Sequence, residues 1–193
     1  MAVFLILAPF GAFAALTLLT SVSASLFASA GVALATIIYD LLRGNSIKIL
    51  AGGSVILFGA LGGYVGFIDS SWSTSTVRLA VDSGVLAISL LSIAFRFPFT
   101  LQYAREQVDA ETTRLAGFMN ANYIITWAWT AAFTLMVVAN VLTIYLPGLP
   151  FWVGIAIALA ARNSAALFTK WYPKHRRAMA AKQALPGAVV SAS

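Results

Sequence analysis

The sequence places a few ionisable and amide side chains inside otherwise apolar stretches. Asp82 follows Arg78 by about one helical turn, and Asn140 stands in a later apolar stretch. Arg162 and its neighbour Asn163 stand in the last one. A charged side chain at mid-bilayer costs at least ~2.5 kcal/mol unless it is paired or reaches the headgroups. The functional interpretation is a polar pathway for a solute, or a pocket for an anionic group centred on Arg162.

The structural interpretation of the same residues is that they hold helices together. Arg78 and Asp82 neutralise each other along one face of a helix. Asp82 and Asn140 enter the membrane from the same boundary by a similar depth, so we expect them to share one polar spot. Arg162 reaches the inner headgroups or extends towards Asp40 at the end of an earlier helix. Both interpretations stay open at the level of sequence.

Catalytic chemistry is not indicated. The chain has no Cys, and its one His, His175, stands in a basic segment near the C-terminus. The six acidic residues are dispersed along the sequence. Thiolate sites, Ser-His pairs, Asp dyads and metal clusters therefore cannot be assembled readily. We predict no enzyme, no metal and no cofactor.

The elements that carry these residues are predicted to be membrane-spanning helices. Hydrophobic residues make up 61% of the 193 residues and charged residues 9%, whereas a soluble domain carries roughly a quarter charged residues. The fold class predicted is all-α, a polytopic bundle of six transmembrane helices. A signal peptide is the alternative for the first, but no Lys or Arg precedes its apolar run, so we expect a retained helix. The predicted spans are Val3–Leu19, Ser21–Tyr39, Ile47–Ile68, Val77–Phe95, Tyr123–Leu146 and Pro150–Thr169.

The distribution of Lys and Arg predicts that both termini lie in the cytoplasm. With the N-terminus inside, Arg78 is the one basic loop residue left on the outer side, as the positive-inside rule requires. The net charge of +6 then reflects topology and contact with anionic lipid headgroups, and no nucleic acid is needed. Residues 1–175 form the predicted membrane domain, and 176–193 a basic, disordered cytoplasmic tail. The inner-side cations are Arg43, Lys48, Arg96, Arg105, Arg114, Lys170, Lys174, Arg176, Arg177 and Lys182.

The longest connection, residues 96–121, mixes apolar and charged residues. Its first half, Thr100–Asp109, has the pattern of a helix with one apolar side. We expect an amphipathic segment at the cytoplasmic interface with the potential to contact a partner. A solvated loop with a short helix is the alternative.

The third predicted helix carries two overlapping pairs of glycines at the spacing of one helical turn. Gly59 pairs with Gly63, and Gly62 with Gly66. Small residues at this spacing let helices approach closely in lipid. We expect packing against the small residues of the second helix, and a homodimer contact or a glycine-lined pore are the alternatives.

A series of residues in the fifth predicted helix resembles the bacterial intracellular septation protein A (YciB-type) family. Trp129, Phe133, Asn140 and Pro147 follow one another as in the penultimate helix of that family, although its Asn close before the Trp has no counterpart here. The resemblance covers most of the chain, except the connection Gln102–Gly117 and the extended tail. Further matches are Phe58-Gly59, Gly62-Gly63, the loop from Asp69 through Trp72 to Arg78, and Pro98.

The resemblance implies an inner-membrane protein of cell-envelope maintenance and division that acts through protein partners. It brings no catalytic residues. A small transporter or channel with a polar pathway at Arg162, Asp82 and Asn140 is the alternative function. A hydrated cavity at these residues would favour transport, whereas buried pairing would favour a role in protein contacts.

Overall fold

The computed structural model describes residues 2–146 and 148–190, and helices dominate both ranges. The all-helical fold class predicted from the sequence is therefore confirmed. The elements in chain order are α1 (Ala2–Leu16), α2 (Val22–Leu42), α3 (Ile49–Gly63) with its π-helical continuation η1 (Tyr64–Ile68), α4 (Thr74–Ala94), α5 (Phe99–Arg105), α6 (Ala110–Arg114), α7 (Ala116–Tyr145) and α8 (Phe151–Val190).

Five helical segments are long and apolar enough to cross a membrane, which identifies a multi-pass membrane protein. The predicted sixth span, Val3–Leu19, is shorter than expected, because α1 has 15 residues and ends at Leu16. At 1.5 Å per residue such a helix reaches roughly 22 Å, against a hydrocarbon core of about 30 Å. The five segments are Val22–Leu42, Ile49–Phe67, Thr74–Ala94, Gly117–Tyr145 and Trp152–Met179.

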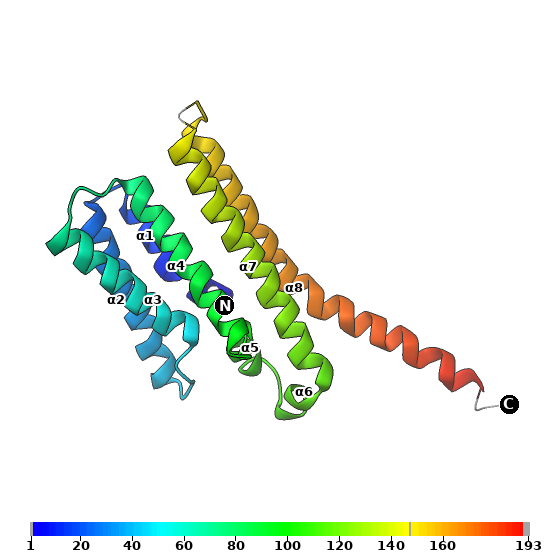
Figure 1. Ribbon diagram of the computed structural model, residues 1–193. Coiled ribbons are helices and arrows are strands. Elements are labelled where there is room, and N and C mark those ends of the chain that lie inside the picture. The colour runs from blue at the N-terminus through cyan, green and yellow to red at the C-terminus, as the bar shows by residue number, and fades with distance from the viewer. Residues whose placement is uncertain (1, 147, 191–193) are drawn as a thin grey trace.

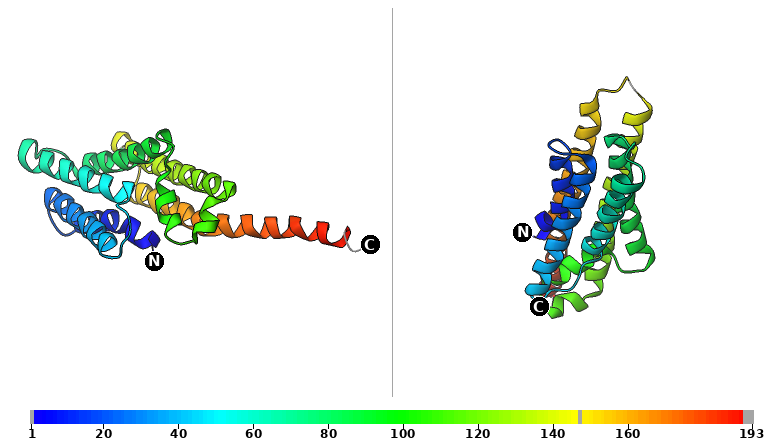
Figure 2. Two further views of the ribbon diagram at one scale, coloured as in Figure 1. Left: turned by 90° about the horizontal axis from the view of Figure 1, so that it is seen from below. Right: turned by 90° about the vertical axis from the view of Figure 1, so that its left-hand side faces the viewer.

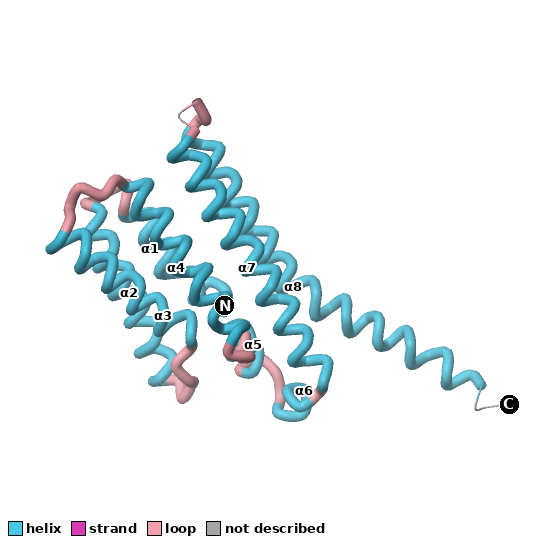
Figure 3. Tube along the Cα trace, in the orientation of Figure 1, coloured by secondary structure: helices cyan, strands magenta, loops and turns pink. Residues whose placement is uncertain are grey.

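The long helices pack side by side in the order of the chain, with α7 between α4 and α8 (Figures 1 and 2). The connections gather at two ends of the bundle, as the tube in Figure 3 shows. We name these the α5 end, which also holds the α2–α3 connection, and the hairpin end, where α7 turns into α8. Figure 1 shows α8 continuing beyond the bundle at the α5 end.

The core between α1, α2 and α3 is aromatic and aliphatic. Phe58 on α3 is fully buried, and the rings of Phe10 and Phe13 on α1 lie 5.3 and 5.7 Å from its centroid. Leu26 on α2 and Leu50 on α3 are buried with them. Helix α1 therefore belongs to the packed bundle through its aromatic side chains.

The glycines of α3 and η1 divide between two environments. A Cβ at Gly62 would lie 3.3 Å from the Phe27 ring and 3.4 Å from Leu26 Cβ, both on α2, and one at Gly66 would lie 3.5 Å from Phe27. A Cβ at Gly59 or Gly63 would meet nothing within 4 Å. Gly62 and Gly66 thus allow the close approach of α2, whereas Gly59 and Gly63 face away from their neighbours.

This division predicts unequal effects of valine at two neighbouring glycines. Gly62→Val is expected to destabilise the bundle by about 1–3 kcal/mol, because its side chain overpacks against Phe27 and Leu26. Gly59→Val, the matched control in the same helix, is expected to leave stability nearly unchanged. Thermal unfolding of both variants in one detergent measures the difference, and equal midpoints would contradict the packing of α2 on Gly62.

The connection 96–121 folds back onto the bundle. Arg96 adopts a positive φ of 58°, and the Phe97 amide donates to the Ser92 carbonyl at 2.9 Å, which ends α4 and reverses the chain. Pro98 then leads into α5, whose Phe99 and Leu101 side chains are buried. The helix expected over Thr100–Asp109 is thus a short one that packs on the bundle and ends at Arg105. Residues 106–107 and 109–111 that follow are exposed, so the segment combines a packed helix with the solvated loop of the alternative.

Two predicted boundaries differ from the structure. Helix α7 begins at Ala116, before the predicted start at Tyr123, because Ala116, Met119 and Ala121 are good helix formers that extend it outside the apolar span. The tail predicted to be disordered from residue 176 is helical as far as Val190, where alanine, a strong helix former, recurs. Residues 191–193 of that predicted tail lie outside the described residues.

Candidate functional site

The polar residues singled out inside the membrane helices converge on α4, α7 and α8. Asn140 Nδ2 on α7 donates a hydrogen bond of 2.6 Å to Asp82 Oδ2 on α4. The expected shared polar spot of these two residues is therefore present. The charges of Arg162 on α8 and Arg78 on α4 both act on the Asp82 carboxylate.

Arg162 does not pair with Asp40, one of the partners expected for it, because Asp40 forms an ion pair with Lys48. The charge of Arg162 instead acts on Asp82. Helix α8 packs mainly on α7, whereas α2, which carries Asp40, packs mainly on α1 and α3. Asn163, next in sequence, is exposed and lines a groove elsewhere on the bundle. It does not join the Asp82 cluster.

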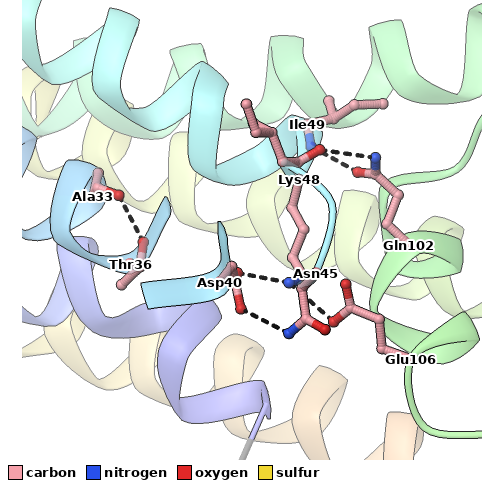
Figure 4. A network of polar contacts seen from close by, with 9 residues as sticks. Ala33, Thr36, Asp40, Asn45, Lys48, Ile49, Gln102 and Glu106 are labelled. Carbon is pink, nitrogen blue, oxygen red and sulfur yellow. Dashed lines mark hydrogen bonds and ion pairs between the residues drawn. The ribbon is translucent and has the colours of Figure 1, made fainter. Parts of the chain in front are cut away.

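A second polar cluster, shown in Figure 4, lies at the α5 end and centres on Lys48. The Lys48 side chain is only 3% exposed, and its Nζ lies 2.6 Å from Asp40 Oδ2 and 3.0 Å from Glu106 Oε2. Asn45 Nδ2 donates to the other Asp40 oxygen at 3.3 Å. Lys48 Nζ also lies 5.4 Å from the centroid of the Tyr103 ring. One buried ammonium thus joins α2, the α2–α3 connection and the chain at the end of α5.

Gln102 of α5 strengthens this junction through the backbone. Its Oε1 accepts a hydrogen bond of 2.6 Å from the Ile49 amide, and its Nε2 donates to the Ile47 carbonyl at 3.3 Å. Figure 4 shows the side chain reaching from α5 to the start of α3. Since Ile47 and Ile49 flank Lys48, Gln102 fixes the backbone that presents the ammonium.

The Lys48 cluster also affects Tyr103. Burial raises the pKa of the Tyr103 phenol above its ordinary value, and the negative charges of Asp40 and Glu106 raise it further. Tyr103 therefore stays neutral at physiological pH, and its ring packs against the Lys48 ammonium. Sequence reasoning missed the cluster because it counted Lys48 only as a topology signal; the hint was a lysine between two isoleucines.

A row of hydroxyl side chains joins α4 and α5 to α7. Ser89 Oγ and Thr130 Oγ1 lie 2.7 Å apart, as do Thr100 Oγ1 and Thr126 Oγ1. Thr100 Oγ1 also donates to the Asn122 carbonyl at 3.0 Å. Over the residues that the structure describes, every buried side-chain nitrogen or oxygen has a hydrogen-bond partner. The buried polar groups are thus engaged in contacts within the bundle.

Within residues 2–146 and 148–190, His, Asp and Glu side chains do not gather in a group able to hold a metal ion. Comparison with family models, curated proteins and solved structures gives no match for this chain. Its function therefore has to be argued from the arrangement of its own residues.

Proposed function

We propose that this chain is a non-enzymatic protein of the bacterial inner membrane that acts through protein partners in envelope maintenance and division. The resemblance of its helices to the septation protein A family supplies the biological setting. The arrangement of the buried polar residues supports a role in protein contacts over one in transport.

The observation that carries this proposal is the pairing of polar groups between helices. A transport pathway needs polar side chains that are free to exchange partners with a solute or with water. Asp82 is instead engaged by Asn140, and Ser89 by Thr130, so the groups that would line a pathway between α4 and α7 hold the two helices together. The transporter alternative rests on the charge of Arg162 near Asp82.

The proposal includes the number of membrane spans and the side of the membrane on which the termini lie. We place six helices in the membrane, with α1 as a short sixth segment held by its contacts to α2 and α3, and both termini in the cytoplasm. Helices α2, α4 and α8 then all end in the cytoplasm, so Arg43, Arg96, Arg105 and the basic part of α8 lie on the side that the positive-inside rule requires. A reporter fused to the C-terminus tests this, and a periplasmic reporter would overturn the orientation.

Labelling of introduced cysteines separates the two functions. The chain has no Cys, so Ser89→Cys and Thr130→Cys each add a single, nearly isosteric thiol between α4 and α7. We expect no reaction with a membrane-impermeant maleimide from either side, because these positions are buried. Ser71→Cys in the exposed α3–α4 loop is the positive control. Rapid labelling at Ser89 or Thr130 would favour the transporter.

The division setting needs its own test. A fluorescent fusion expressed from the native locus is expected to concentrate at the division site, and loss of the protein to lengthen the cells. Uniform membrane fluorescence together with normal cell length would overturn the septation assignment, whatever the cysteine labelling shows.

A further inference from the structure

A groove opens at the α5 end, between α5 and α6 on one side and α7 and α8 on the other. Its volume of about 1130 Å³ lies at the upper limit of the roughly 300–1,000 Å³ of small-molecule pockets. Asn163, predicted as part of a polar site, is one of several uncharged polar residues along it. Tyr103 lies between the groove and the Lys48 cluster, and the charged side chains of the Asp82 and Lys48 clusters do not line the groove.

The inner part of the groove is mainly apolar, and the polar side chains there, Thr100, Asn122 and Thr169, are hydrogen-bonded within the bundle. Phe99 of α5 and Ile125 and Trp129 of α7 are buried and line it, and Ala166 lines it from α8. The indole N–H of Trp129 is already bonded to Thr169 Oγ1 at 2.9 Å, so Trp129 offers an occupant a hydrophobic surface. This part of the groove fits hydrocarbon.

The outer part of the groove is cationic. Lys170, Lys174, Arg176 and Arg177 of α8 line it, and no Asp or Glu does. Lys170, Lys174 and Arg177 recur at the spacing of one helix face, so their charges converge on the same edge. A Cβ at Gly117 would lie 3.1 Å from Arg176 Nη2, which places this guanidinium over the first turn of α7.

The first turn of α7 adds to the positive potential at this edge. Its N-cap residue, Leu115, has no side-chain group to accept from the first amides of the helix. The positive end of the α7 dipole therefore lies beside the cations of α8. The groove thus has hydrocarbon-like walls inside and concentrated positive charge outside.

We propose that this groove binds one anionic phospholipid, with the acyl chains against Phe99, Ile125 and Ala166 and the phosphate at Lys170, Lys174 and Arg177. Charge complementarity selects the occupant: a bilayer lipid with a net negative headgroup matches both parts at once. The lysines and arginines stand near the end of the candidate span Trp152–Met179, at the depth where headgroups lie. This inference goes beyond the proposed function and does not depend on it.

Native mass spectrometry of the delipidated full chain in detergent, titrated with phosphatidylglycerol, tests the proposal. One lipid is expected to bind tightly. The triple variant Lys170→Gln, Lys174→Gln, Arg177→Gln is expected to bind it about a hundredfold more weakly, at about fivefold for each cation. The matched triple Arg43→Gln, Arg96→Gln, Arg105→Gln removes equal charge from residues that do not line the groove and is expected to retain the lipid.

A second variant tests the apolar part without changing charge. Ala166→Phe fills the inner groove and is expected to abolish tight binding, while its thermal unfolding midpoint reports that the fold is intact. Phosphatidylcholine is expected to bind weakly, and excess inorganic phosphate is expected not to displace the phosphatidylglycerol.

Four results would overturn the proposal. Equal loss of binding in both triple variants would show general attraction to a positive protein. Binding of phosphatidylcholine as tightly as phosphatidylglycerol, or displacement by inorganic phosphate, would show a nonspecific lipid surface or a simple anion site. Binding of an acidic helical peptide in place of phosphatidylglycerol would make the occupant a protein.

Discussion

Replacing Lys48 by methionine is expected to destabilise the folded protein by about 3–5 kcal/mol, the cost of leaving a buried charge without its partner. The Lys48 ammonium lies between the carboxylates of Asp40 and Glu106 and is almost fully removed from solvent. Methionine fills a similar volume without the charge, so the loss reports electrostatics and not a cavity. Unfolding in mixed detergent micelles, followed by circular dichroism, measures it.

The two carboxylates are expected to contribute unequally. The Asp40 side chain is 13% exposed and that of Glu106 25% exposed. Solvent screens the more exposed partner, so Glu106→Gln is expected to cost about 1 kcal/mol or less, and Asp40→Asn more. Adding Asp40→Asn to Lys48→Met is expected to recover part of the stability, because the orphaned charge is then removed.

A matched control separates burial from charge. Arg43→Met removes an exposed cation from the same connection and is expected to change stability by less than about 1 kcal/mol. A loss for Lys48→Met no larger than that of Arg43→Met would contradict the buried ion cluster.

The sequence allowed the long helices to be predicted because the bilayer forces a simple pattern on them. Every backbone amide inside lipid must bond within its own helix, so apolar length alone locates most spans. Asp82 and Asn140 were paired correctly for a related reason, since both stand at a similar depth from one end of the bundle. Depth along a helix is readable from residue counts.

The rotation of a helix about its axis and the identity of the helices beside it cannot be inferred from residue counts. Arg162 was assigned towards Asp40 because both were expected near the inner side, yet α8 packs on α7 and away from α2, and the charge of Arg162 acts on Asp82. The glycines show the same limit: both pairs were expected on one face packed against α2, but only Gly62 and Gly66 lie against it.

The Lys48 cluster escaped prediction because it depends on a turn. Arg96 has to adopt a left-handed conformation before α5 can fold back and bring Gln102 and Glu106 to the start of α3. Residues other than Gly, Asn and Asp rarely adopt that conformation, so no sequence signal marks it. A long-range contact that follows from one such turn cannot be inferred from local patterns.

Removing the Asp82 side chain is expected to produce the second large effect. Asp82→Leu should destabilise the protein by about 1.5–3 kcal/mol, because it deletes a hydrogen bond to a charged group between α4 and α7. It also leaves Arg162 inside the bundle without the carboxylate that faces it. Asp69→Leu, which removes a loop carboxylate hydrogen-bonded to nearby Ser71, is the control and is expected to have a smaller effect.

Two double-mutant cycles divide this loss between the hydrogen bond and the charge. The cycle of Asp82→Leu with Asn140→Leu is expected to give a coupling of about 0.6–1.7 kcal/mol, the range for side-chain hydrogen bonds between membrane helices. The cycle of Asp82→Leu with Arg162→Leu is expected to give a coupling of the same sign, because removing both charges leaves neither unpaired.

The second cycle also bears on function. If Arg162 serves to neutralise Asp82, then Arg162→Leu should destabilise the wild type more than it destabilises Asp82→Leu. If Arg162 instead serves a solute, its removal should change stability little in either background, and Asp82 and Arg162 should show no coupling. A coupling near zero would therefore contradict a structural role for Arg162 beside Asp82. It would favour the alternative in which Arg162 belongs to a transport pathway.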